Sequence, residues 1–228
     1  MEFHAFKSRD AASRASAGQI AFRLNARLAS DSAAAIVVSG GTSPVDCFAH
    51  LAQTALDWGR VVIHLSDERW IDPGDDASNE KLVRTHLTVN QAAGASVAPI
   101  YAPGVDVESH CDALDAQLRQ RNAPFAASLL GMGTDGHFAS LFPDALNLEE
   151  GLDPGSSRQC IAVTTAASPL QRVSLTLNAL NNSDEIILLF FGNEKRRVFD
   201  AAVEGAGDYP VSRLLKTPRT RLSVFWAP

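Results

Sequence analysis

His137 is the residue of this sequence whose type and surroundings most directly indicate acid–base chemistry. It lies in the stretch SLLGMGTDGHFASLFP, residues 128–143, two positions after Asp135 and beside several glycines. A histidine titrates near neutral pH and can take a proton from water, while a carboxylate can hold its ring and stabilise the cation that forms. We therefore predict that His137 is a general base held by Asp135. The alternative is a capped turn that carries a surface histidine.

A second candidate is the glycine-rich turn SGGTSP at residues 39–44. Gly40 and Gly41 let the backbone approach a ligand closely, and Thr42 and Ser43 add two hydroxyl groups, which together suit a phosphate. The turn lacks the lysine of a P-loop and the spacing of a dinucleotide fingerprint, so it implies neither ATP nor NAD. A plain strand-to-helix turn is the alternative.

The segment SDERW, residues 66–70, brings two carboxylates and a guanidinium together. Arg69 is suited to bidentate recognition of a phosphate or an oxyanion. Asp67 and Glu68 are either proton carriers or partners that orient the arginine. A solvated charged turn would give the same pattern.

Three further cations are candidate contacts for an anion. Lys195 lies in the first turn of a helix expected after GNEK, where the helix dipole disfavours a cation unless an anion is near. Arg172 precedes the segment VSLTL, and Arg213 lies in the C-terminal part of the chain. For each of the three, the alternative is an ordinary surface cation with no role in binding.

Apolar strands that alternate with amphipathic helices must position these motifs. The expected strands are 34–38, 61–65, 125–130, 160–164, 172–177, 184–191 and 221–226. The expected helices are 8–30, 45–57 with Ser43 as its N-cap, 78–87, 107–121 and 192–205. The alternation predicts an α/β fold, Rossmann-like, with one mainly parallel sheet covered by helices on both faces, in a single domain of residues 1–228. The four motifs then follow strands at one sheet edge, where such folds bind ligands.

Composition restricts the class of partner. The 228 residues are 46% hydrophobic and 20% charged, and the formal net charge of −6 argues against nucleic acid as the main partner. The longest apolar run, at residues 186–191, is too short to span a bilayer, so we expect a cytoplasmic protein with no membrane association. The cysteines Cys47, Cys111 and Cys160 lack metal-like spacing and are expected to be unpaired thiols in a reducing compartment. We expect no metal, no other cofactor and no obligate protein partner.

Taken together and in this order, the motifs resemble the 6-phosphogluconolactonase family. The resemblance rests on VSGGTSP, on LSDERW followed by SNEKLVRTHL, on LLGMGTDGHFASLFP and on RVSLTLNALNNSDEIILLFFGNEK, and it covers about residues 35–215. The related glucosamine-6-phosphate deaminases typically carry a tyrosine where Arg69 stands, and a different sequence after the histidine. DERW and ASLFP therefore favour the lactonase.

The resemblance implies hydrolysis of a small phosphorylated sugar lactone, 6-phospho-D-glucono-1,5-lactone, in the oxidative pentose phosphate pathway. His137 matches the family's catalytic histidine and Asp135 its neighbour. Residues at substrate-binding positions are Gly40, Gly41, Thr42, Ser43, Arg69, Arg172 and Lys195. A lactone is an activated ester, so neither a covalent nucleophile nor a metal is required. Two alternatives stay open at this point, a deaminase-like isomerase and a non-catalytic sugar-phosphate-binding protein.

Overall fold

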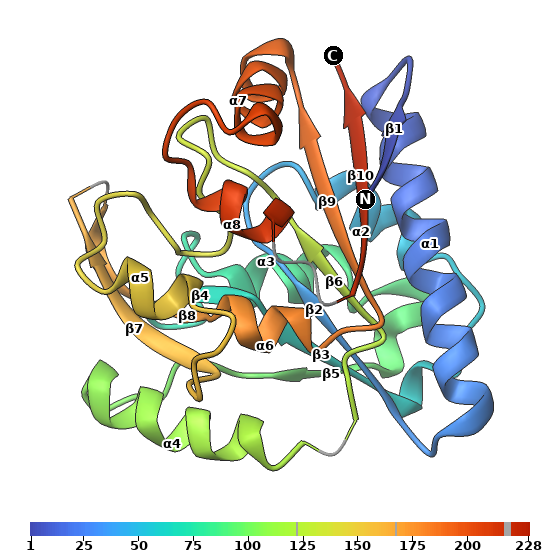
Figure 1. The fold of residues 1–228 in the computed structure, drawn as a ribbon. Coiled ribbons are helices and arrows are strands. Elements are labelled where there is room, and N and C mark those ends of the chain that lie inside the picture. Colours follow the sequence, from blue (N-terminus) through green and yellow to red (C-terminus); the bar gives the residue numbers. More distant parts are fainter. Residues whose placement is uncertain (122, 167, 217–219) are drawn as a thin grey trace.

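A seven-stranded sheet runs through the middle of the molecule, and every strand in it is parallel to its neighbours (Figure 1). The computed structural model describes residues 1–121, 123–166, 168–216 and 220–228. The strand order is β1-β10-β9-β6-β2-β3-β5. The strands are β1 (Glu2–Ala5), β2 (Ala34–Val38), β3 (Val61–Leu65), β5 (Ser96–Ala98), β6 (Ala127–Leu130), β9 (Glu185–Phe191) and β10 (Arg221–Ala227).

Three more strands form a separate antiparallel sheet in the order β4-β8-β7. They are β4 (Asp67–Arg69), β7 (Cys160–Thr165) and β8 (Ser168–Leu175). The sequence predicted the segments of β7 and β8 as strands, but it predicted neither a second sheet nor a strand at Asp67–Arg69. In this sheet Arg69 pairs directly with Arg172. Because paired residues on neighbouring strands project to the same face, the small sheet brings two arginines together.

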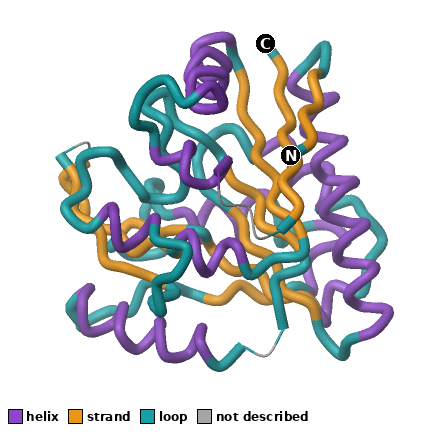
Figure 2. Tube along the Cα trace, in the orientation of Figure 1, coloured by secondary structure: helices purple, strands orange, loops and turns teal. Residues whose placement is uncertain are grey.

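Helices cover both faces of the large sheet, as the sequence predicted. They are α1 (Arg9–Ser30), α2 (Val45–Leu51), α3 (Asn79–His86), α4 (Val107–Arg119), α5 (Leu148–Leu152), α6 (Leu177–Asn181), α7 (Asn193–Glu204) and α8 (Pro210–Lys216), with 3₁₀ turns at Trp58–Arg60 and Asn90–Gly94. Helix α1 packs on β9, β10, β2 and β6 along one side of the sheet, and α6 lies on the other side (Figures 1 and 2). Helix α4 packs instead on β7 and β8.

Several of the predicted element ends are wrong, and the largest difference is in the helix predicted at 45–57, which ends at Leu51. Ser43 does not cap α2, because Pro44 occupies the N-cap position and no side chain there makes a capping bond. The strand expected at 172–177 ends at Leu175, since Thr176 caps α6 and accepts a hydrogen bond from the backbone N–H of Ala179. Of the two caps suggested for α3, Ser78 is the one observed, and its side chain accepts from the N–H of Lys81.

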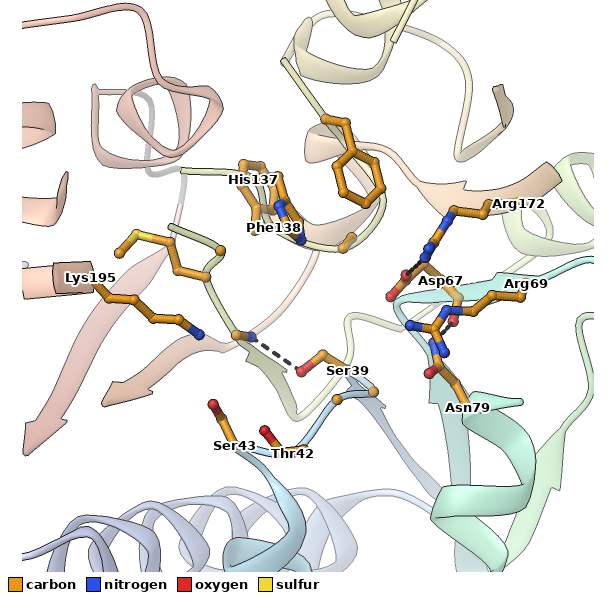
Figure 3. Close-up of a pocket in the computed structure, with 17 residues that line it drawn as sticks. Ser39, Thr42, Ser43, Asp67, Arg69, Asn79, His137, Phe138, Arg172 and Lys195 are labelled. Carbon is orange, nitrogen blue, oxygen red and sulfur yellow. Dashed lines mark hydrogen bonds and ion pairs between the residues drawn. The ribbon is translucent and has the colours of Figure 1, made fainter. Parts of the chain in front are cut away.

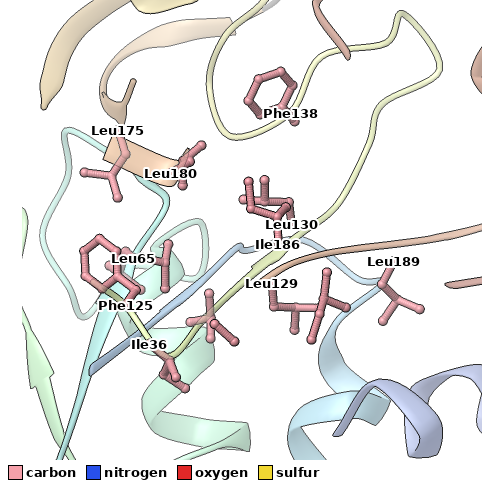
Figure 4. Packing of buried hydrophobic residues seen from close by; sticks show 14 of the residues in the cluster. Ile36, Leu65, Phe125, Leu129, Leu130, Phe138, Leu175, Leu180, Ile186 and Leu189 are labelled. Atoms are coloured by element: carbon pink, nitrogen blue, oxygen red, sulfur yellow. The ribbon is translucent and has the colours of Figure 1, made fainter. Parts of the chain in front are cut away.

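The buried apolar side chains form one cluster on both faces of the large sheet (Figure 4). Strand β2 is buried along its whole length, as expected of an interior parallel strand. Phe138, immediately after the candidate base, is among the largest fully buried side chains. The three cysteines are buried free thiols, and the sulfurs of Cys111 and Cys160 lie 3.4 Å apart. Within the described ranges, no helix has both the length and the apolar character needed to cross a bilayer.

Candidate active site

The four motifs follow four strands that are neighbours in the sheet, β9, β6, β2 and β3. Because these strands are parallel, their carboxyl ends meet at one edge, and a cavity of about 370 Å³ opens there (Figure 3). It is lined by Ser39, Gly40, Gly41, Thr42, Ser43, Asp67, Arg69, Asn79, Gly131, Met132, Gly133, His137, Phe138, Ala139, Phe142, Arg172 and Lys195. The topology therefore assembles the site that the motifs predicted.

The glycine turn lines the cavity between Lys195 and the two arginines, Arg69 and Arg172 (Figure 3). Gly41 has φ +85°, a conformation that favours glycine. A side chain at Gly40 would overlap the amide of Asn79, so this position also requires glycine. The Ser39 hydroxyl accepts a hydrogen bond from the N–H of Gly131 at 3.1 Å, which joins the turn to the loop of His137.

His137 and Asp135 form a hydrogen-bonded pair. The ring Nδ1 lies 2.6 Å from Asp135 Oδ1, and the same oxygen accepts from the backbone N–H of His137 at 3.1 Å. An ionised carboxylate only accepts, so Nδ1 carries the hydrogen and Nε2 keeps its lone pair. Burial raises the pKa of Asp135, but the hydrogen bond from His137 and its charge outweigh burial and hold that pKa below its usual value.

Close packing holds this loop in place. The position of a Cβ on Gly133 would overlap both the His137 ring and the Asp135 carboxylate. The His137 ring packs against that of Phe142, with 4.2 Å between centroids. Ala139 has φ +50°, unusual for a residue other than glycine and a mark of local backbone strain. The fully buried Phe138 beside it anchors the loop in the core.

Arg69 and Arg172 lie side by side at the opposite end of the cavity from Lys195 (Figure 3). The guanidinium of Arg69 donates to the carbonyl of Ala77, and that of Arg172 lies over the ring of Phe142. The Nε atoms of both arginines are buried and have no hydrogen-bond partner among the described residues. Two adjacent cations with unused donors form an electropositive wall suited to an anion.

The two carboxylates of SDERW are already bonded within the protein. Glu68 accepts from the backbone N–H groups of Asn79 at 2.8 Å and Glu80 at 2.7 Å, and from the Ser78 hydroxyl at 3.0 Å. Burial raises the pKa of Glu68, although these donors and the N–H of Arg69 oppose the shift. Glu68 therefore secures the start of α3 and does not face the cavity, whereas Asp67 lines it.

Lys195 reaches the cavity from the first turn of α7, on the side of Thr42 and Ser43 (Figure 3). Burial lowers the pKa of its ammonium group; Arg9 lowers it further, and Asp135 and Glu194 oppose the change. The lysine lies near the start of the helix, where the dipole disfavours a cation. A bound anion would relieve both costs.

The structure places every predicted substrate-binding residue on the cavity wall. His137 also lines it, while Asp135 lies behind the ring. Two other sequence candidates do not line the cavity: Glu68, and Arg213, which pairs with Glu149 at 3.0 Å. Sequence reasoning missed Asn79 as a wall residue. Its only signal was its place directly after the helix cap Ser78.

Histidine, cysteine, aspartate and glutamate are the side chains that most often bind metal ions in proteins. In the part of the chain that the structure describes, no three such side chains are grouped to hold a metal ion. The cavity wall instead offers guanidinium, ammonium, hydroxyl and backbone N–H donors around one imidazole. This donor set can bind a phosphorylated, anionic small molecule and move a proton to or from it.

Comparison with known proteins agrees with this arrangement. The sequence model of the family described as glucosamine-6-phosphate isomerases/6-phosphogluconolactonase matches residues 7–226. The chain belongs to this family. The 6-phosphogluconolactonase of Caulobacter vibrioides is 37% identical over 229 residues, which cover 100% of this chain and 97% of that protein. The 6-phosphogluconolactonase of Mesorhizobium japonicum is 37% identical over 226 residues, with 99% and 95% covered.

Solved structures of the family share the fold. A 6-phosphogluconolactonase from Shewanella baltica superimposes with a TM-score of 0.94 at 33% identity, covering 100% of this chain and 98% of that one. A monomeric glucosamine-6-phosphate deaminase has a TM-score of 0.76 at 14% identity, a likeness of fold alone. The predicted family and fold class are both confirmed.

Proposed function

We propose that this chain hydrolyses 6-phospho-D-glucono-1,5-lactone to 6-phospho-D-gluconate, a step of the oxidative pentose phosphate pathway. The relatives that cover nearly its whole length are 6-phosphogluconolactonases. The observation that carries the proposal is the imidazole of His137, whose Nδ1 is bonded to Asp135 while the ring lines a cavity walled by Arg69, Arg172 and Lys195. A free Nε2 in a cationic cavity fits a base that acts on an anionic substrate.

In this proposal His137 Nε2 takes a proton from water, and the resulting hydroxide attacks the C1 carbonyl of the lactone. Asp135 stabilises the imidazolium through Nδ1. The carbonyl oxygen gains negative charge, which an arginine or a backbone N–H group of the cavity stabilises. As the tetrahedral intermediate collapses, the bond from C1 to the ring oxygen breaks, and the imidazolium returns its proton to that oxygen.

The phosphate group would be held by the cations and hydroxyls of the cavity. Lys195, Thr42 and Ser43 lie together on one side, and the two arginines lie on the other (Figure 3). Loss of a contact to phosphate is expected chiefly to raise KM, whereas loss of an oxyanion donor is expected chiefly to lower kcat. Kinetics of variants that each lack one cation would therefore show which cation binds phosphate and which stabilises the oxyanion.

A deaminase-like isomerase is a weaker alternative for this site. Its chemistry would need a proton carrier acting at C2 of a sugar, and the candidates were Asp67 and Glu68. Glu68 is committed to the start of α3, and both oxygens of Asp67 already accept serine hydroxyls. A non-catalytic sugar-phosphate-binding protein would not require the imidazole–carboxylate pair. The cytoplasmic location and the lack of an obligate partner remain predictions.

One experiment separates these functions. The protein is incubated with 6-phosphogluconolactone and, in a parallel reaction, with glucosamine 6-phosphate, while acid and ammonia release are followed. We expect acid release above the spontaneous rate and no ammonia. Ammonia release would support the isomerase, and neither product would support a binding protein.

His137→Ala tests the base, with an expected loss in kcat of about 10²- to 10⁴-fold. His50→Ala is the matched control, because His50 also contacts an aspartate, Asp10, at 2.8 Å but does not line the cavity. That variant should keep wild-type turnover. Near-normal kcat in His137→Ala would remove His137 as the base.

A further inference from the structure

The carboxylate of Asp67 lies at the arginine end of the cavity and is bonded on both oxygens. Oδ1 accepts from the Ser66 hydroxyl at 2.6 Å, and Oδ2 accepts from the Ser140 hydroxyl at 2.6 Å. Asp67 and both serines are buried. Both oxygens of this carboxylate are therefore occupied by hydroxyl groups of the protein, which leaves it poorly placed to take a proton from a substrate.

Ser140 connects this anion to a cation. Its hydroxyl donates to Asp67 and accepts from Arg172 Nη1 at 3.3 Å, while Arg172 Nη1 itself lies 4.0 Å from Asp67 Oδ2. The serine oxygen therefore completes a contact that the two charged groups make only weakly by themselves. Because Arg172 is buried beside Arg69, it needs a compensating negative charge to stay in place.

The same serine is part of the loop that carries His137. It follows the strained residue Ala139, and its backbone N–H donates to the Ser174 hydroxyl of β8 at 3.1 Å. Strand β8 also carries Arg172. Ser140 thus fixes the loop of the base and the strand of the arginine relative to each other.

We propose that Ser140 is a positioning residue that, together with the fixed anion Asp67, orients the Arg172 guanidinium toward the substrate. The inference rests on the proposed function for the identity of the substrate. It assigns Asp67 the role of a counter-charge and not of a proton carrier. Arg172 lines the cavity, so its guanidinium, held in this way, can contact an anion there.

A double-mutant cycle tests this role, because a residue that acts through Arg172 has no effect once Arg172 is removed. Ser140→Ala is expected to lower kcat/KM about 10- to 100-fold when Arg172 is present, as for the loss of a hydrogen bond to a charged group. In an Arg172→Ala background the same change should cost less than about two-fold. Equal losses in the two backgrounds would overturn the proposal.

Ser128→Ala is the matched control for simple loss of a buried hydroxyl. Ser128 is also buried, and its hydroxyl contacts that of Ser183 at 2.8 Å, outside the cavity. It is expected to lower the Tm by a few degrees, as Ser140→Ala does, with kcat/KM unchanged. A similar loss of kcat/KM in this control would show that the effect of Ser140→Ala is structural, against the proposal.

Asp67→Asn provides a second test, which also serves if Ser140→Ala does not fold. It removes the counter-charge and keeps an acceptor for Ser140. The expected result is a loss of kcat/KM that again vanishes without Arg172, while the acid limb of the pH profile stays where the wild type has it. A loss of kcat/KM of the same size in both backgrounds, with the acid limb missing from the remaining turnover, would identify Asp67 as a proton carrier and overturn the proposal.

Failure of the proposed function can be told apart from failure of this inference. If the wild type shows no lactonase activity, the same cycle is run with inorganic phosphate as the probe and its Kd as the readout in calorimetry. We expect Ser140→Ala to raise the Kd about ten-fold only when Arg172 is present. A Kd that changes equally in both backgrounds would reject the positioning role whatever the substrate is.

Discussion

Two aspartates at the cavity pair with a basic side chain, Asp135 with His137 and Asp67 with Arg172. The two pairs differ in how far they are buried. At the first, the side chains of His137 and Asp135 are 28% and 43% exposed. At the second, those of Arg172 and Asp67 are 10% and 7% exposed, with Ser140 between them. The first pair is open enough for water to reach it, whereas the second is buried and held by hydroxyl groups. The first pair is suited to chemistry and the second to orientation.

Among changes that leave the His137 imidazole in the open pair, the largest effect is expected from Asp135→Asn. The amide can donate to Nδ1 of His137 and so favours the tautomer with hydrogen on Nε2, which cannot accept a proton from water. It also removes the charge that stabilises the imidazolium. We expect kcat to fall about 10²- to 10³-fold with little change in KM.

Steady-state kinetics corrected for spontaneous hydrolysis measure this effect. Asp10→Asn, which alters the histidine–aspartate pair at His50, is the control and should leave kcat unchanged. If Asp135→Asn instead raised KM alone, Asp135 would belong with the residues that bind substrate and the contrast between the pairs would be lost.

A smaller effect is expected from displacing the open pair without changing its chemistry. Gly133→Ala places a methyl group where the His137 ring and the Asp135 carboxylate now lie, so the ring must move. A shift of about 1 Å in a catalytic group can cost about 10²-fold in rate, and we expect a loss in kcat of this order.

The control for Gly133→Ala is Gly18→Ala in α1, where an added Cβ meets no atom within 4 Å. It should leave kcat unchanged and raise the Tm slightly, because alanine is the better helix former. A crystal structure of the Gly133→Ala variant with His137 undisplaced, or full activity, would contradict the expected packing.

The smallest expected effect is a change of binding affinity with pH, which comes from Lys195. Burial lowers the pKa of Lys195 below its usual 10.5, so its charge is lost as pH rises through that lowered value, while the arginines stay charged. Affinity for the stable product 6-phosphogluconate should therefore fall about ten-fold between neutral pH and pH 10. Calorimetry on wild type and Lys195→Arg measures it, and the arginine variant should lose most of this dependence. A pH-independent wild-type affinity would place Lys195 outside the binding site.

Much of the site could be predicted because its residues follow strands that the apolar runs reveal. The runs at 34–38, 61–65 and 184–191 each correspond to a strand of the parallel sheet, and parallel strands bring the following loops to one edge. The motifs at Gly40 and His137 needed only this topology to meet. The residue types and the spacing within each of these two motifs already indicated its chemistry.

The arginine end of the cavity was harder to predict, for a physical reason. Strand β4 is three polar residues long and is defined only by pairing with β8, about a hundred positions further along the chain. Nothing local in SDERW or in QRVSL indicates that Arg69 and Arg172 are neighbours. The part played by Ser140 likewise depends on contacts to residues remote in sequence, and such contacts leave no periodic pattern.

The close approach of Gly40 and Asn79 restricts how this enzyme can change. The amide of Asn79 donates to the Asp67 carbonyl at 2.8 Å and fills the space that any larger residue at 40 would enter. A substitution at either position alone creates an overlap or a void. Variants that reshape this wall, to admit a bulkier sugar for example, must therefore exchange both residues in one step, and libraries that randomise single positions will not reach them.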